Sequence, residues 1–214
     1  LGDPQVSPDG LRLLYGVSYT SVEENRSSRN LFVCDLDGGN RTQISRDAAS
    51  LNNARWIDDN HIAYIQKGQI WTARLKRGKL VSRLQISDVV GGVSEFSISP
   101  DGSRILYSGV CAGSVKCPGD IYPDLEKAEA YAATDLMYRH WDHWVTEIPH
   151  SYVALFRPFA EKCITKANST DILGRENPYE LPTEPFGGLE QLAWSPDGNT
   201  IVYYFVDAEA TFSS

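Results

Sequence analysis

The sequence predicts an all-β fold, a partial β-propeller made of four-stranded antiparallel blades. Three observations predict it. A four-residue turn motif recurs along the chain, strand-like segments surround each copy, and one repeat unit has the length of one propeller blade. A helical insertion is expected to interrupt the third unit, so the predicted fold is a propeller with one elaborated blade.

The turn motif is Ser-Pro-Asp-Gly, which occupies 7–10, 99–102 and 195–198. A degenerate copy, WIDDNHIAYIQ, lies at 56–66. In such a turn the proline fixes φ at the second position and the glycine adopts positive φ. Apolar residues then alternate with polar ones over five or six positions, which is typical of a half-buried strand. Each motif therefore predicts the hairpin that joins the first two strands of a blade.

The remainder of each unit also repeats. Segments 30–45 and 68–87 each contain a strand, a glycine turn and a second strand, and both end in Gln-Ile-Ser. A unit thus holds four short strands in about 40–45 residues. The predicted blades cover about 5–46, 52–88, 93–185 and, cut short, 189–214. Because an open arc leaves unpaired strand edges, we expect an N-terminal part of a larger protein. Closure by a second copy, as a homodimer, is the alternative.

The third unit contains a surplus of residues, for which the sequence predicts a helical insertion at 120–150. Two apolar series carry this prediction, each with the spacing of three and four that is typical of helices. They are Leu125, Ala128, Ala132 and Leu136, followed by Met137, Trp141, Trp144 and Ile148. Pro149 is expected to end the helix. Long insertions into compact repeats usually carry function.

Composition excludes several classes of partner. Of 214 residues, 42% are hydrophobic and 22% charged, and the net charge is −8. An acidic surface argues against nucleic acid and anionic membranes. No apolar run approaches the roughly 18–20 residues of a transmembrane span. No signal peptide opens the sequence, so we expect any export signal to have been removed.

Four cysteines leave two interpretations open. Cys111 and Cys117 bracket a five-residue segment that a disulfide could close, but spacing alone is equally compatible with reduced thiols. A bridge would imply an oxidising compartment. The pairing of Cys34 and Cys163 is not predicted. Because the histidines and cysteines lack ligand spacing, no metal and no cofactor are expected.

The repeats, together with three further segments, resemble the propeller of bacterial dipeptidyl peptidase V-type enzymes, in the prolyl oligopeptidase family of serine peptidases. The segments are DIYPDL (120–125), DLMYRHWDHWVTEIPH (135–150) and NPYELPTEPFGG (177–188). The resemblance covers nearly the whole chain, although TolB-like propellers share the turn motif. It implies a propeller that caps an α/β-hydrolase domain, with the active site between them, in the bacterial periplasm or secreted.

The resemblance also suggests a substrate-binding cluster. A peptide ammonium group is held best by carboxylates and by aromatic faces. The candidates are Asp142, Glu147, Glu180, Trp141, Trp144, Tyr138, Tyr179 and Arg139. Ordinary structural roles compete with this interpretation. The tryptophans could be packing anchors, and Asp142 with Arg139 could be an exposed helical ion pair.

The sequence lacks the catalytic machinery that the resemblance implies. Such a hydrolase needs a serine in Gly-x-Ser-x-Gly, followed by an aspartate and a histidine, and that pattern does not occur. With the α/β-hydrolase domain absent, the chain alone is expected to be inactive. The predicted function is gating and N-terminus recognition in a serine dipeptidyl peptidase, with oligopeptides and the missing C-terminal domain as partners. The alternative is a non-enzymatic TolB-like propeller that acts as a protein-interaction module.

Overall fold

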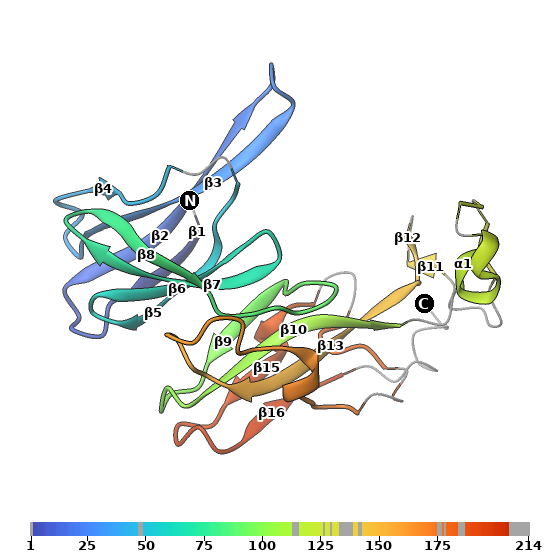
Figure 1. Ribbon diagram of the computed structural model, residues 1–214. Coiled ribbons are helices and arrows are strands. Elements are labelled where there is room, and N and C mark those ends of the chain that lie inside the picture. The colour runs from blue at the N-terminus through green and yellow to red at the C-terminus, as the bar shows by residue number, and fades with distance from the viewer. Residues whose placement is uncertain are drawn as a thin grey trace.

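The computed structural model is nearly all-β, which confirms the predicted class (Figure 1). It describes residues 2–46, 49–112, 116–125, 127–128, 130–132, 139–140, 143–174, 177, 179–183 and 187–205. These residues form three four-stranded antiparallel sheets and two two-stranded ones. The three four-stranded sheets lie beside one another in chain order, with the first at one end of the molecule (Figure 1).

The first two sheets are built from consecutive strands. They contain β1 (Gly2–Val6), β2 (Arg12–Ser21), β3 (Arg26–Asp35) and β4 (Thr42–Gln43), then β5 (Asn52–Asp58), β6 (His61–Gln66), β7 (Gln69–Lys76) and β8 (Lys79–Gln85). The third sheet has the order β14-β13-β10-β9. Its strands are β9 (Glu95–Ile98), β10 (Arg104–Ala112), β13 (Glu147–Leu155) and β14 (Thr170–Asp171).

The smaller elements complete the fold. They are the hairpins β11 (Arg139–His140) with β12 (His143–Trp144) and β15 (Leu192–Trp194) with β16 (Ile201–Tyr203), the short helix α1 (Pro118–Ile121), and the 3-10 turns η1 (Pro123–Leu125), η2 (Lys166–Asn168) and η3 (Leu189–Gln191). In the part of the chain listed above as described, no helix has the length and apolarity to cross a bilayer.

The recurring turn motif forms the same hydrogen bonds in each copy. In the first, the Ser7 hydroxyl donates to Asp9 Oδ1 at 2.5 Å and accepts from the Arg12 amide at 2.9 Å. The copies at 99–102 and 195–198 repeat both bonds. Gly10 has φ of 73°, a conformation that glycine adopts without a steric penalty. The predicted hairpin turns are therefore present.

The Gln-Ile-Ser motif closes the outer edge of two sheets. Ser45 Oγ accepts the Leu31 amide at 2.8 Å, and Ser87 Oγ accepts the Ile70 amide at 2.7 Å. Both serines are buried, and the preceding isoleucines fill the core. Each glutamine side chain donates to the carbonyl oxygen of its own serine at 2.8 Å. The repeat in the sequence thus has a direct hydrogen-bonding cause.

Hydrophobic clusters fill the spaces between neighbouring sheets. Leu14 and Tyr64 belong to a cluster between the first and second sheets, while Ile70 and Ile105 belong to one between the second and third. A further cluster joins the third sheet to β15 and β16. The four consecutive residues 62–65 of β6 are all buried. The expected half-buried alternation is therefore wrong for this strand, because another sheet packs against each of its faces.

The predicted helical insertion at 120–150 is also wrong. Only α1 and η1, each less than two turns long, are helical among the described residues of that range. Residues 147–155 instead pair with β10 along its whole length, from Arg104 with Leu155 to Ala112 with Glu147. A spacing of four residues keeps side chains on one face of a helix, but it also keeps them on one face of a strand. The pairing with β10 decides between the two.

Candidate functional site

Several predicted substrate-binding residues lie where β10 and β13 extend beyond their neighbours β9 and β14, towards α1, β11 and β12 (Figure 1). Trp144 is 40% exposed, and its ring stacks on that of Tyr131 with centroids 4.6 Å apart. Glu147 begins β13 and its side chain is exposed. Arg139 pairs with Trp144 across the β11–β12 hairpin. Trp141, Asp142 and Tyr138 lie outside the described residues.

The loop that carries the other two candidates runs beside β13. The Leu181 amide donates to the Pro149 carbonyl oxygen at 2.9 Å, and the Ser151 hydroxyl donates to the Leu181 carbonyl oxygen at 2.9 Å. Glu180 therefore lies on a segment adjacent to the one that carries Glu147. The Tyr179 ring stacks on Phe205, with centroids 5.4 Å apart. Residues more than 30 positions apart in the sequence are thus brought together at this end of the molecule.

A buried histidine–aspartate pair lies next to this region, between β13 and β14. His150 Nδ1 lies 2.8 Å from Asp171 Oδ2, and the histidine is fully buried. Its Nε2 has no hydrogen-bond partner among the residues that the structure describes. The pair joins β13 to the edge strand β14. Within the described ranges, no group of three or more histidine, cysteine or acidic side chains is arranged to hold a metal ion.

All four cysteines are free thiols in the structure. Cys111 packs against Val145 and Ile148. Burial, followed by the negative charge of Asp171, raises the pKa of the Cys111 thiol to about 11. The thiol is therefore protonated and weakly nucleophilic at neutral pH. The bridge between Cys111 and Cys117 stays a prediction.

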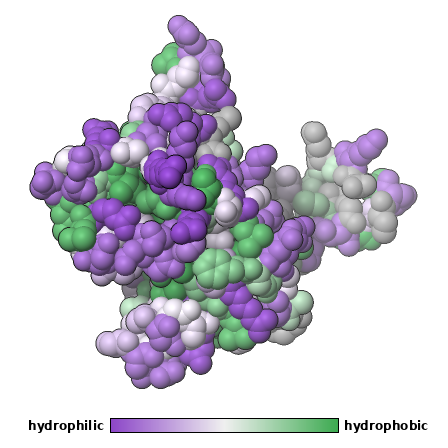
Figure 2. Space-filling view, turned by 60° about the vertical axis from the view of Figure 1, so that its left-hand side comes forward, coloured by the Kyte–Doolittle hydropathy of each residue, from purple (hydrophilic) through white to green (hydrophobic). Residues whose placement is uncertain are grey.

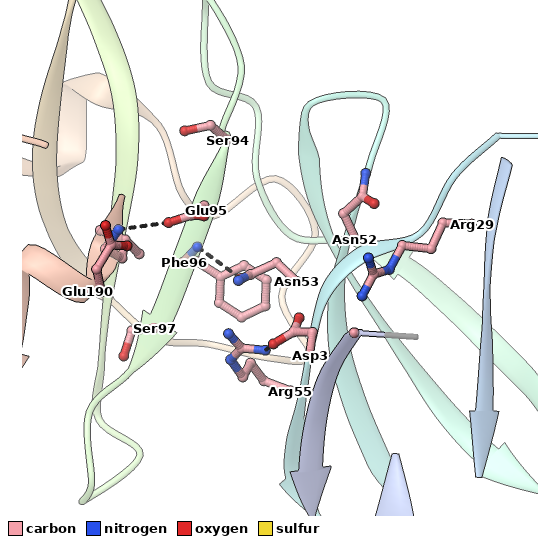
Figure 3. Close-up of a pocket in the computed structure, with 12 residues that line it drawn as sticks. Asp3, Arg29, Asn52, Asn53, Arg55, Ser94, Glu95, Phe96, Ser97 and Glu190 are labelled. Carbon is pink, nitrogen blue, oxygen red and sulfur yellow. Dashed lines mark hydrogen bonds and ion pairs between the residues drawn. The ribbon is translucent and has the colours of Figure 1, made fainter. Parts of the chain in front are cut away.

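A polar pocket of about 570 Å³ lies where the first strands of the three large sheets meet (Figure 3). Its volume is within the range of small-molecule sites. The lining comes mainly from β1, β5 and β9, with contributions from β3 and η3, and consists of Gly2, Asp3, Arg29, Asn52, Asn53, Arg55, Ser94, Glu95, Phe96, Ser97, Leu189 and Glu190. Sequence reasoning did not identify this pocket.

Two first strands bulge at the pocket in the same way. In β1, Gly2 pairs with Gly16 but Gln5 pairs with Leu14, so β1 contains one extra residue. In β5 the same offset separates Asn52 and Arg55. Asp3 and Asn53, inside these bulges, have φ of 58° and 49°. Aspartate and asparagine tolerate this left-handed conformation better than most residues. Bulges re-aim side chains and are frequent beside functional sites.

Most charged groups of the pocket already have partners. Arg55 forms an ion pair with Asp3 at 2.6 Å. Glu95 Oε2 accepts the Leu189 amide at 2.7 Å, and Glu190 Oε1 accepts the Gly188 amide at 2.9 Å. Each glutamate thus uses one carboxylate oxygen to hold η3 and forms no ion pair with any cation that the structure describes.

Arg29 is different, because its guanidinium forms no ion pair with any carboxylate that the structure describes. The side chain lies across Gly16 and Gly2. A methyl group at Gly16 would come within 2.2 Å of Arg29 Nε, and one at Gly2 within 3.2 Å of Nη2. Only the Arg29 backbone forms hydrogen bonds to residues that the structure describes. Because the two glycines have no side chains, the guanidinium can pack directly on their backbone. Its N–H donors then remain available to a ligand.

The repeat contained a signal for part of this pocket. Asp3 and Glu95 each stand four positions before the first serine of a Ser-Pro-Asp-Gly turn, and Asn53 stands at the corresponding position of the degenerate copy. All three line the pocket. A polar residue at one repeat position, next to a buried strand, could have indicated a shared polar centre. Arg29 has no such counterpart.

No protein-family model matches the chain. Relatives named dipeptidyl-peptidase 5 do match. The protein from Porphyromonas gingivalis is 37% identical over 92% of this chain and 28% of its own length. The protein from Porphyromonas endodontalis is 32% identical over 95% of this chain and 29% of its own length. The protein from Aspergillus fumigatus is 23% identical over 92% of this chain and 29% of its own length. The chain therefore spans less than a third of these relatives.

Solved structures show the same fold. The chain matches acylaminoacyl peptidase from Pyrococcus horikoshii with a TM-score of 0.55 and 17% identity, over 79% of this chain and 25% of that one. An acylaminoacyl peptidase in complex with Z-Gly-Gly-Phe-chloromethyl ketone gives a TM-score of 0.54 and 16% identity, over 79% and 24%. The chain is thus related, over nearly all its length, to a segment of proteins named dipeptidyl-peptidase 5.

Proposed function

We propose that this chain is the substrate-recognising, incomplete β-propeller of a serine dipeptidyl peptidase in the prolyl oligopeptidase family. The observation that carries the proposal is the match of 92% and 95% of the chain to two proteins named dipeptidyl-peptidase 5. Successive antiparallel sheets with first strands around a common pocket are what a propeller requires. The chemistry would reside in an α/β-hydrolase domain, since no Gly-x-Ser-x-Gly occurs in the chain.

The proposed role is to admit short peptides and to hold their free N-terminus. Glu147 and Glu180 are the proposed amine ligands, because they lie on adjacent segments near the start of β13 and carboxylates bind ammonium through charge-assisted hydrogen bonds. Trp144 and Tyr179 would form aromatic walls. Asp142, Trp141, Tyr138 and Arg139 complete the proposed cluster.

Kinetics of the complete enzyme test this role. We expect Glu147→Gln and Glu180→Gln each to lower kcat/KM for dipeptidyl-aminomethylcoumarin substrates by roughly tenfold or more, because each removes a charged hydrogen-bond acceptor. Glu161→Gln, in an exposed loop, is the matched control. Unchanged kinetics in both single variants and in the double variant would show that the amine is bound elsewhere.

We further propose a periplasmic or secreted location, and with it a disulfide between Cys111 and Cys117, formed when a thiol oxidant of that compartment removes two electrons and two protons from the two thiols. A non-reduced mass spectrum of protein isolated from its native compartment is the measurement. We expect a mass two hydrogens below that of the reduced chain, and a disulfide link between the peptides that contain Cys111 and Cys117. Four alkylatable thiols would exclude the bridge.

A further inference from the structure

The pocket at the first strands has two ends of opposite charge. Figure 3 shows Glu95 and Glu190 on one side, and Arg29 with Asn52 on the other. Asp3 and Arg55 neutralise each other between them. The charges that are available to a ligand are therefore one guanidinium and two carboxylates, on different elements of the fold.

The cationic end is suited to a carboxylate. Arg29 presents a planar set of donors and has no ion-pair partner among the described residues, and guanidinium groups bind carboxylates in a bidentate manner. Between the two ends, Asn53 uses its side-chain oxygen to accept the Phe96 amide at 2.9 Å (Figure 3). That bond orients the Asn53 amide group and leaves its NH2 donors for a second acceptor. A phosphate group would meet the same donors, but the nearby glutamates disfavour a polyanion.

The anionic end is suited to an ammonium group. Glu95 and Glu190 each use one oxygen for a backbone amide of the segment 188–189, which fixes the carboxylates in place. A methyl group at Gly188 would lie within 3.0 Å of both glutamate side chains, so the two carboxylates flank one point of the backbone. Like charges this close favour a cation between them.

We propose that this pocket binds short peptides as zwitterions, with the C-terminal carboxylate at Arg29 and the N-terminal ammonium at Glu95 and Glu190. The site is separate from the proposed amine ligands Glu147 and Glu180, and it does not depend on catalysis. In a dipeptidyl peptidase its occupant would be a released dipeptide or a very short substrate, because only these carry both charges within one pocket.

Calorimetric titration of the 214-residue chain tests the proposal with ligands of graded charge. The probes are Ala-Ala, Ala-Ala amide, which lacks the carboxylate, and N-acetyl-Ala-Ala, which lacks the ammonium. We expect Ala-Ala to bind roughly tenfold or more tightly than either capped peptide. Equal affinities for all three, or no saturable binding by a chain whose circular dichroism shows β structure, would overturn the proposal without any substitution.

Variants assign the two ends. Arg29→Gln is expected to weaken Ala-Ala to the level of Ala-Ala amide and to leave the amide unaffected. Glu95→Gln with Glu190→Gln should instead remove the preference for a free amine. Arg26→Gln, in the exposed ion pair with Glu24, is the control. If Arg29→Gln weakened Ala-Ala and its amide equally, the carboxylate assignment would be wrong. Because this test reads binding and not hydrolysis, it is independent of the kinetic test of Glu147 and Glu180.

Discussion

At the scale of single residues, the turn aspartates have a measurable electrostatic signature. Hydrogen bonds from the Ser103 and Ser99 side chains are the largest causes that lower the pKa of Asp101, to about 2. The same type of bond lowers the pKa values of Asp9 and Asp197. A carboxylate whose pKa is depressed by folding stabilises the native state above its unfolded pKa. That contribution is lost as the pH falls through the folded value.

We therefore expect Asp101→Asn to be less stable than the unsubstituted chain at pH 6, with a difference that shrinks between about pH 4 and pH 2. Melting temperature against pH, followed by circular dichroism, is the measurement. The control is Asp124→Asn, at an exposed position of η1. A constant difference across the acid range would mean that the pKa of Asp101 is not responsible.

At the scale of the element, the serine of Gln-Ile-Ser replaces a missing strand bond. Ser87 is fully buried and supplies the acceptor for the Ile70 amide, because β8 has already ended at Gln85. Such local side-chain acceptors finish a sheet where backbone pairing stops. The same arrangement at Ser45 shows that it is a property of the repeat and not of one loop.

Ser87→Ala should lower the free energy of unfolding by about 1–3 kcal/mol, since a buried amide loses its acceptor. Urea denaturation measures the change. Ser18→Ala, at an exposed position of β2, provides the comparison and should lie within about 0.5 kcal/mol of the unsubstituted chain. If Ser87→Ala costs no more than Ser18→Ala, the hydroxyl is not the essential acceptor.

Strands that begin at a Ser-Pro-Asp-Gly turn could be predicted, because the turn chemistry and the following apolar residues are local. The region after β10 could not. Trp144 and Ile148 are four residues apart, as in a helix, yet they lie in two different strands, β12 and β13, and only β13 pairs with β10. Proline at 149 was expected to end a helix, yet it lies opposite Val110 within the β10–β13 ladder. Long-range pairing of this kind leaves no mark in a short window of sequence.

At the scale of the whole molecule, neighbouring sheets share their cores. Ile105 of the third sheet is fully buried in one cluster with Ile70 and Ile86. Ile70 lies in β7 of the second sheet, and Ile86 directly follows β8 of the same sheet. Neither sheet can therefore bury its facing side chains alone, as in other repeat architectures. The candidate pocket has the same origin, because its lining comes from several repeats. For this reason, the repeat pattern could indicate that Asp3 and Glu95 line a common site, whereas only the structure shows that Arg29 lines the same pocket.

We expect Ile105→Ala to lower the free energy of unfolding by about 2–5 kcal/mol and to speed amide exchange in both β6 and β10. Hydrogen exchange read by mass spectrometry is the measurement. Val22→Ala is the control, since Val22 is 91% exposed at a hairpin tip. Faster exchange confined to β10 would show that the sheets unfold independently. Figure 2 shows that hydrophilic residues cover most of the visible face and that hydrophobic ones form smaller patches between them.

The packing of Arg29 on Gly16 and Gly2 has a consequence for how this surface can evolve. A side chain at position 16 would occupy the space of the guanidinium, so Arg29 can keep this side-chain position only while residue 16 is glycine. Substitution of Gly16 should displace the Arg29 guanidinium from the pocket without changing any group that a ligand contacts. Among related sequences, those with a guanidinium in this pocket should therefore have glycine at the position of Gly16. Sequences with a larger residue there should lack the cation.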